Sequence, residues 1–257
     1  MGPRAVRAVS TNLAWEGAVN GWGFSPFDVL SVVDYGDCPF DHGRPADIPE
    51  QIYRYAKDIL AQDVALLTFG GDHFTTYPLL RAYSERYGPI SLVHFDAHSD
   101  TWADNDGRID HATMFYHAAQ KNMVVPNRSV QVGLRTHNPD TLGFNVISAA
   151  QVHDSKGRAI AADVKRIVGE CPVYLTFDID CLDPSVAPGT GTPVVGGLSA
   201  HQAITILQGL EGINLIGMDI VEVAPAYDVS EITALAAATI ALNQLCIFAK
   251  SLAARKG

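Results

Sequence analysis

The chain has 257 residues, 47% of them apolar and 18% charged, which is typical of a globular protein and excludes a disordered one. The formal net charge is −10, and no cluster of Lys and Arg offers the positive surface that nucleic acids require. The acidic balance instead suits a cationic small molecule or a divalent metal ion.

Short apolar runs alternate with amphipathic stretches along the chain. The expected strands are 64–69, 90–95, 173–177 and 215–220, and the expected helices are 49–61, 77–87, 159–170, 200–209 and about 230–253. Strands this apolar are buried on both faces, which is typical of parallel sheets. No linker or repeat divides the chain, so we expect one domain, 1–257, with the fold of a three-layer α/β/α sandwich around a mostly parallel sheet.

The longest uncharged run, 232–249, contains Thr233, Thr239, Asn243 and Gln244. These polar residues favour a buried core helix over a membrane span, and no membrane partner is predicted. The four cysteines form no CxxC pair, and the N-terminus carries no secretory signal. We therefore expect a cytoplasmic protein with reduced thiols.

Charged residues gather where four of the expected strands end. The segments are 67-LTFGGDHF-74, 94-HFDAHSD-100, 174-YLTFDIDCLDP-184 and 217-GMDIVEVAP-225. Residues two apart in an extended segment point the same way, so Asp96, His98 and Asp100 converge on one side. Asp178 and Asp180 repeat this arrangement. One such pair alone is weak evidence, because the pattern occurs widely.

Together, the strand ends predict a metal centre. Four carboxylates and two imidazoles repel one another unless they are neutralised, and these segments contain no Lys or Arg. Two divalent cations offset four negative charges, and two-metal sites usually serve hydrolysis. Oxygen-rich ligand sets favour Mn²⁺ over the softer zinc sites. The candidate metal ligands are His73, Asp96, His98, Asp100, Asp178 and Asp180.

The same segments resemble the signatures of the ureohydrolases, the arginase and agmatinase family. The likeness extends to 189-GTGTPVVGG-197 and 227-YDVSEITALAAATIA-241 and covers nearly the whole chain. It implies an arginase/deacetylase-like fold and two Mn²⁺ ions per chain, bridged by Asp96 and Asp178. The implied ligand sets are His73, Asp96, Asp100 and Asp178 for one ion and Asp96, His98, Asp178 and Asp180 for the other.

The resemblance also implies catalytic and substrate-binding residues. His111 corresponds to a proton-shuttling histidine, Glu222 to the carboxylate that holds the substrate guanidinium, and Thr192 to a threonine of the same pocket. Asp100 is placed to accept a hydrogen bond from a metal-bridging hydroxide. The implied reaction is hydrolysis of the guanidinium group of agmatine to putrescine and urea, and the implied assembly is a trimer or hexamer of identical chains.

Several neighbouring residues are given structural roles. We interpret His94, inside a strand, as a hydrogen-bonded core residue rather than a ligand. Asp72 and Asp183 are expected to orient ligands and loops. Asp219 stays open between that role and a backbone hydrogen bond.

Other functions remain open on the sequence. The acidic loop 101–110 favours a cationic substrate tail over a carboxylate, but its aspartates can equally be solvated turn residues. The alternatives are another guanidine substrate, such as 4-guanidinobutyrate or arginine, and an N-terminally shortened metal-binding homologue without activity. An amide deacetylase fits less well, because such sites usually hold one metal.

Two features depart from the family pattern. Segment 2–16 resembles one that normally follows a first strand and a glycine-rich loop, so the N-terminal strand is expected to be missing. Ala112 stands where the pattern has glycine after the shuttle histidine, and a positive φ there would strain it.

Overall fold

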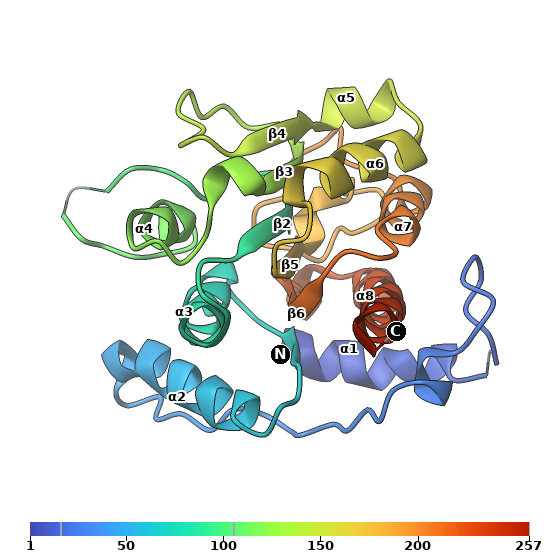
Figure 1. Ribbon diagram of the computed structural model, residues 1–257, viewed down its shortest axis with the longest axis horizontal. Helices are drawn as coiled ribbons and strands as arrows, with labels where there is room; N and C mark the ends of the chain where they lie inside the picture. Colours follow the sequence, from blue (N-terminus) through green and yellow to red (C-terminus); the bar gives the residue numbers. More distant parts are fainter. Residues whose placement is uncertain (16, 105, 257) are drawn as a thin grey trace.

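A parallel sheet of six strands forms the centre of the computed structural model, which describes residues 1–15, 17–104 and 106–256 (Figure 1). Every described strand pair is parallel, and the spatial order is β1-β6-β5-β2-β3-β4. The strands are β1 (Leu67–Phe69), β2 (Ser91–Phe95), β3 (Val130–Leu134), β4 (Asn145–Ser148), β5 (Val173–Asp178) and β6 (Leu215–Val221).

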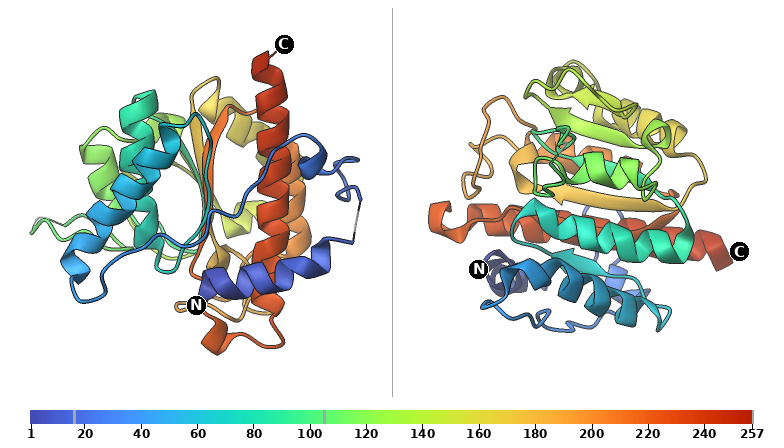
Figure 2. Two further views of the ribbon diagram at one scale, coloured as in Figure 1. Left: turned by 90° about the horizontal axis from the view of Figure 1, so that it is seen from below. Right: turned by 90° about the vertical axis from the view of Figure 1, so that its left-hand side faces the viewer.

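Helices cover both faces of this sheet, which confirms the predicted three-layer sandwich (Figure 2). One layer holds α2 (Ile48–Leu60), α3 (Thr76–Tyr87) and α4 (Met114–Gln120). The other holds α1 (Gly2–Ser10), α5 (Ala149–His153), α6 (Gly157–Val168), α7 (Ala200–Gly209) and α8 (Ile232–Lys256).

The sheet separates two hydrophobic cores, because neighbouring residues of a strand point to opposite faces. On β2, Leu92 packs with Leu80 and Tyr83 of α3, whereas Val93 belongs to the core beneath α6, α7 and α8. All residues of β2, β3, β5 and β6 are buried. The prediction of strands buried on both faces is therefore confirmed for β2, β5 and β6, whereas β1 is only partly buried.

The last helix, α8, is long and apolar enough to cross a membrane by length and composition alone. Most of that stretch is buried against the rest of the protein, and α8 packs on β6, α1 and α7 (Figure 2). This packing agrees with the predicted core helix.

Five elements were not predicted, and each is either short or has an interrupted apolar run. Strand β3 reads VQVGL, in which Gln131 and Gly133 interrupt the apolar run, and β4 has only four residues. Helices α1, α4 and α5 have at most nine residues each. Among the described residues no strand precedes β1, which lies at one edge of the sheet and is only partly buried.

Candidate active site

The strand order brings all four charged segments to one place. Strands β1, β6, β5 and β2 are successive neighbours, and parallel strands end at the same edge of a sheet. The chain leaves β1 into the 3₁₀ turn η4 (His73–Thr75) and leaves β5 into the 3₁₀ turn η6 (Ile179–Cys181). Asp96 and the rest of its segment follow β2, and Glu222 follows β6 directly.

The first cluster surrounds the Nδ1 atom of His73. Carboxylate oxygens of three aspartates lie close to this nitrogen: Asp100 at 3.0 Å, Asp96 at 3.1 Å and Asp178 at 3.3 Å. All four residues are buried. They are the four residues that the family resemblance assigns to one metal ion.

The second cluster lies beside the first and shares Asp96 with it. Nδ1 of His98 is 3.0 Å from Oδ2 of Asp180 and 3.4 Å from Oδ1 of Asp96. The two oxygens of Asp96 thus face different histidines, as a bridging carboxylate requires. The second oxygen of Asp178 instead accepts a hydrogen bond from the backbone N–H of Asp180.

The donor atoms fit divalent metal ions. Within the described part of the chain, Nδ1 of His73 and Oδ2 of Asp180 are buried, and their contacts at 3.0–3.3 Å do not have the geometry of hydrogen bonds. A buried polar atom without a partner is costly, and coordination of a metal removes that cost. The set contains carboxylate oxygens and two imidazoles, without thiolate, which suits Mn²⁺ or a similar hard ion.

Without metal, this site should make stability depend on pH in a defined direction. The carboxylates of Asp180 and Asp96 raise the pKa of His98 from its ordinary 6.5 to about 10. Protonated His98 therefore stabilises the metal-free fold below pH 6.5, and this stabilisation is lost as the pH rises to 10. Burial also raises the pKa of Asp180, so its ionisation acts in the same direction.

The expected result is a melting temperature of the chelator-treated protein that falls between pH 6.5 and 10. Addition of Mn²⁺ should flatten this fall, because metal binding favours deprotonated ligands. Thermal unfolding with and without Mn²⁺ would measure both curves, and H98N should show a weaker fall without metal. Parallel curves with and without metal would contradict the assignment of a metal centre.

Buried side chains outside the clusters hold two of the candidate ligands. Nε2 of His94 lies 2.7 Å from Asp96, and the amide of Gln131 donates to Nδ1 of His94 at 3.1 Å. This arrangement confirms that His94 is a hydrogen-bonded core residue. Behind His73, Nε2 lies 2.9 Å from the hydroxyl of Thr176, which leaves Nδ1 for the cluster.

Asp219, whose role was open, is fully buried behind the same centre. Its carboxylate accepts hydrogen bonds from the hydroxyls of Thr76 and Tyr174, and its backbone carbonyl accepts one from Gln244. It is therefore a supporting residue between β6, α3 and α8. Sequence reasoning missed Gln131, Thr176 and Tyr174, since each lies inside a strand with no distinguishing motif.

A third group of side chains lies next to the His73 cluster. Oε1 of Glu222 accepts a hydrogen bond from the backbone N–H of His73 at 2.6 Å, and Nδ1 of His111 is 2.9 Å from Asp72. Glu222, His111 and Asp72 bring ligand atoms within 4.8 Å of one another. The structure thus brings the predicted guanidinium-binding carboxylate and the predicted proton shuttle together.

Local backbone strain and charge mark this third group and Asp100 of the neighbouring first cluster. Glu222 has φ +63° and Asp100 has φ +54°, a region that non-glycine residues adopt at some cost and often at functional sites. Burial raises the pKa of Glu222, and the neighbouring Asp72 raises the pKa of His111. Ala112 has no positive φ, so the replacement of glycine there causes no backbone strain.

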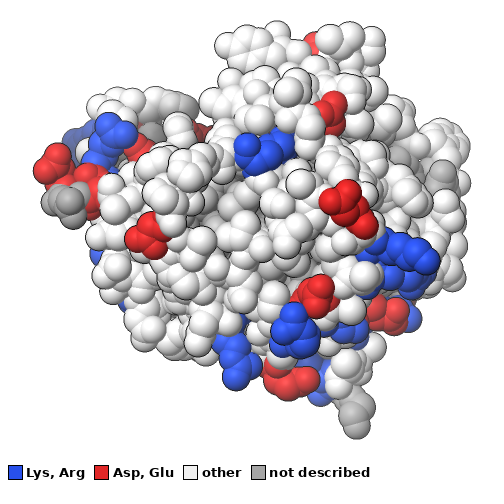
Figure 3. Space-filling view, turned by 90° about the horizontal axis from the view of Figure 1, so that it is seen from above, with Lys and Arg blue, Asp and Glu red and all other residues white. Residues whose placement is uncertain are grey.

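The remaining predicted residues lie in exposed loops. Thr192 is exposed and follows Gly191, where an added Cβ would lie 3.9 Å from Oε2 of Glu222. In the loop 101–110, Asp110 pairs with Arg108 at 2.5 Å, so its charge is offset. Figure 3 likewise shows acidic and basic side chains side by side at the protruding end on the left. The described part of the loop 101–110 therefore carries both acidic and basic side chains and is not purely acidic.

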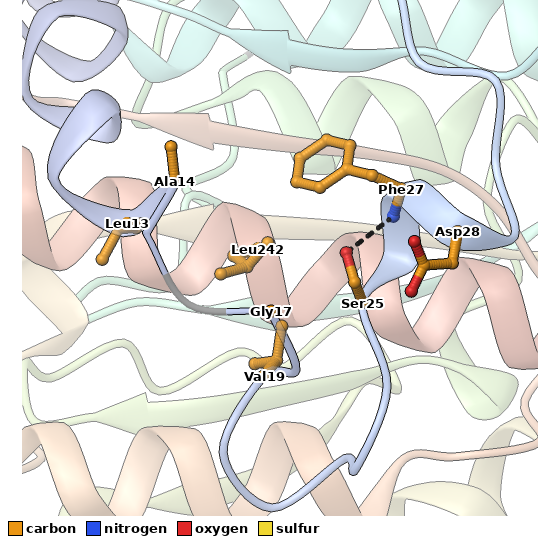
Figure 4. A pocket seen from close by; sticks show the side chains of 8 residues that line it. All are labelled: Leu13, Ala14, Gly17, Val19, Ser25, Phe27, Asp28 and Leu242. Atoms are coloured by element: carbon orange, nitrogen blue, oxygen red, sulfur yellow. Dashed lines mark hydrogen bonds between the residues drawn. The ribbon is translucent and has the colours of Figure 1, made fainter.

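A separate surface pocket of about 310 Å³ lies between the N-terminal segment and α8 (Figure 4). It is lined by Leu13, Ala14, Gly17, Val19, Ser25, Phe27, Asp28 and Leu242. None of the candidate site residues lines it, and it offers the hydroxyl of Ser25 and the carboxylate of Asp28 beside apolar side chains.

Comparison with known proteins agrees with this geometry. The sequence model of the arginase family matches residues 1–246. An agmatinase from Chromobacterium violaceum is 55% identical over 249 residues, which cover 96% of this chain and 77% of the relative. The crystal structure of a hypothetical agmatinase from Burkholderia thailandensis has 56% identity and a TM-score of 0.95, covering 98% of this chain and 80% of that one.

A more distant solved structure is also similar. Proclavaminate amidino hydrolase from Streptomyces clavuligerus has 34% identity and a TM-score of 0.87, covering 97% of this chain and 85% of that one. The fold and the site define a three-layer α/β protein with paired histidine–carboxylate clusters at the sheet edge. The chain belongs to the arginase family. The predicted resemblance and the predicted class, an amidinohydrolase of the agmatinase type that acts on linear C–N bonds, are confirmed.

Proposed function

We propose that this protein hydrolyses the guanidinium group of agmatine to putrescine and urea with two Mn²⁺ ions. The observation that carries the proposal is the position of Glu222 between the His73 cluster and the His111–Asp72 pair. A carboxylate there can bind a guanidinium with two parallel hydrogen bonds. The agmatinase relatives, at 54–55% identity, support the choice of agmatine.

The chain's own residues suit each step of such a hydrolysis. Glu222 holds the guanidinium carbon against the carboxylate clusters. When bound, the two ions would lower the pKa of water and so supply a nucleophile at neutral pH. His111 donates a proton to the departing amine, and Asp72 keeps the imidazole oriented and raises its pKa, so that more of it carries that proton. Asp100 accepts a hydrogen bond from the attacking group.

The ligand assignment stays within the predicted set. His73, Asp100 and Asp178 would hold one ion, His98 and Asp180 the other, and Asp96 would bridge. Asp178 as a second bridge, Mn²⁺ as the ion and Thr192 as a pocket residue are parts of the proposal. A homo-oligomer and a cytoplasmic location are proposed from the family resemblance and the cysteine spacing respectively.

Urea release tests the substrate directly. Agmatine, arginine and 4-guanidinobutyrate would be compared at equal concentration with Mn²⁺-loaded protein and with chelator-treated protein as the control. We expect manganese-dependent urea, fastest from agmatine. Faster release from a carboxylate-bearing compound would replace agmatine by that substrate. Metal stabilisation without urea from any of them would favour a non-catalytic homologue.

A second substrate class has one specific observation in its favour. The loop 101–110 carries Arg108 beside Asp110, and the relative from Streptomyces clavuligerus is named for a different substrate. The pairing offsets the charge of Arg108 as well, but its side chain is 76% exposed, and an Arg108 released from Asp110 would suit a carboxylate-bearing guanidine compound. The substrate comparison above distinguishes the two classes.

A further inference from the structure

Arg135 lies just beyond β3, and main-chain carbonyl oxygens surround its guanidinium. Nε donates to the carbonyl of Val194 at 3.0 Å, and Nη2 donates to the carbonyls of Asp180 at 2.6 Å and Val194 at 2.7 Å. Weaker bonds reach the carbonyls of Gly133, Cys181 and Leu182 at 3.2–3.4 Å. All six hydrogen bonds end on backbone rather than on a carboxylate.

Apart from the carbonyl of Gly133, which lies in β3, these carbonyls belong to two segments that meet in the active site. One is the turn η6, whose Asp180 faces His98. The other is the loop 188–197, in which Gly191 approaches Glu222. One planar side chain therefore joins the turn that carries a candidate metal ligand to the loop beside the substrate carboxylate. Arginine suits this task because its five N–H donors lie in a rigid plane, unlike the single ammonium of lysine.

The backbone around Arg135 leaves room for this contact at two glycines. A Cβ at Gly197 would lie 2.8 Å from Nη2 of Arg135 and 2.6 Å from the backbone nitrogen of Asp183. A Cβ at Gly133, which has φ +101°, would lie 2.6 Å from Sγ of Cys181. Contacts this short do not occur for real Cβ atoms, so larger residues at either glycine would push the turn and the loop apart.

Asp183 also holds the loop 188–197. Oδ2 of Asp183 accepts hydrogen bonds from the backbone N–H groups of Gly196 and Gly197 at 2.8 and 3.1 Å. Oδ1 accepts from the backbone N–H of Ser185 at 3.0 Å. This confirms the expectation that Asp183 orients a loop. Arg135 thus donates to the backbone carbonyl of Val194, and Asp183 accepts from the backbone N–H groups of Gly196 and Gly197 in the same loop.

We propose that Arg135 is a positioning residue that holds the loop 188–197 against the Asp180 turn. Its first consequence is the affinity of the site at His98 and Asp180 for a metal ion. Its second is the KM for the guanidinium substrate. The second consequence rests on the proposed function, whereas the first needs only the geometry of the turn. Loss of Arg135 leaves the carbonyls of Asp180 and Val194 without this donor and frees the loop to move away from Glu222.

Full-length R135M and R135K would be tested against wild type, with R166M as the matched control because Arg166 lies on the exposed face of α6. Mn²⁺ binding would be titrated calorimetrically on metal-free protein, and kcat and KM for agmatine would be measured on loaded protein. Residues that orient metal ligands without contacting the metal typically contribute about 10- to 100-fold to metal affinity or activity. We expect R135M to weaken one of two Mn²⁺ sites and to raise KM by about 10- to 100-fold, more than it lowers kcat. R135K should show a smaller loss, and R166M none.

A folded R135M with wild-type metal affinities and KM would overturn the proposal. If R135M does not fold, R135K decides in its place: a raised KM and one weakened Mn²⁺ site support the proposal, and wild-type values overturn it. If wild-type protein releases no urea from agmatine, the proposed function fails, but the metal titration still tests Arg135. Hydrogen exchange of the amides of 185–198 should also be faster in metal-free R135K or R135M than in wild type.

Discussion

Replacement of Asp178 by asparagine is expected to reduce urea release from agmatine by well over the roughly 100-fold seen when only a supporting residue is removed. Asp178 is buried, and one of its oxygens faces Nδ1 of His73 while the other accepts from the Asp180 backbone. Asparagine keeps the shape of the side chain but removes the charge that a divalent ion requires.

The same variant should have the opposite effect on the metal-free fold. Burial, together with the charges of Asp180 and Asp96, raises the pKa of Asp178 well above its ordinary value. The ionised carboxylate is therefore unfavourable in the empty cluster, and a neutral amide relieves the repulsion. We expect metal-free D178N to melt at or above the temperature of metal-free wild type at a mildly alkaline pH, with little further stabilisation by Mn²⁺.

Thermal unfolding with and without Mn²⁺, together with urea release, measures both effects. The control is D163N, because Asp163 is an exposed residue of α6 that pairs with Arg166 on the same helix. It should behave as wild type in every assay. Unchanged stabilisation by Mn²⁺ in D178N would remove Asp178 from the set of metal ligands.

Replacement of Glu222 by glutamine is expected to separate substrate binding from metal binding. The glutamine oxygen can still accept the hydrogen bond that Oε1 receives from the His73 backbone, so the fold and the clusters should persist. The charged pair with the guanidinium is lost, and removal of one partner of a buried charged pair costs about 2–5 kcal/mol. The expected fall in kcat/KM for agmatine is therefore about 30- to 5,000-fold.

Mn²⁺ titration and steady-state kinetics on the same preparation test this separation. E222Q should bind two Mn²⁺ ions with affinities close to those of wild type. E211Q serves as the control, because Glu211 lies on the surface and pairs with Lys250. Loss of metal binding in parallel with activity would mean that Glu222 supports the metal centre rather than the substrate.

Much of the sheet was predictable because its strands are buried on both faces. Largely apolar runs that lead into Asp96, Asp178 and Glu222 mark β2, β5 and β6, and the predicted bounds agree with the observed ones to within one residue. Strand β1 is shorter than predicted, beginning at Leu67 rather than Val64, and Val64 is exposed. Strand β3 was not predicted because Gln131 and Gly133 interrupt its apolar run. Gln131 donates a hydrogen bond to His94, and Gly133 leaves room for the side chain of Cys181.

The candidate ligands were also predictable from the sequence, since carboxylates at the ends of apolar strands are costly to bury unless a metal ion or a basic partner neutralises them. The residues that hold them were not. His94 was expected only to make hydrogen bonds, and its partners Asp96 and Gln131 lie after β2 and within β3. Arg135 has no motif, because its acceptors are backbone carbonyls that any sequence supplies.

The amino-acid sequence alone shows which strands end in carboxylates and imidazoles, and in what order these segments follow along the chain. Alternation of apolar strand and helix also determined the sandwich, because those patterns leave few other ways to bury both faces of a sheet. The strand order makes β1, β6, β5 and β2 neighbours, and this order, which no local pattern shows, selects the charges that share a cluster. The packing of distant segments likewise places Asp72 against His111 and Arg135 between the Asp180 turn and the loop 188–197. Such contacts depend on distances between segments far apart in sequence, and local patterns carry no information about them.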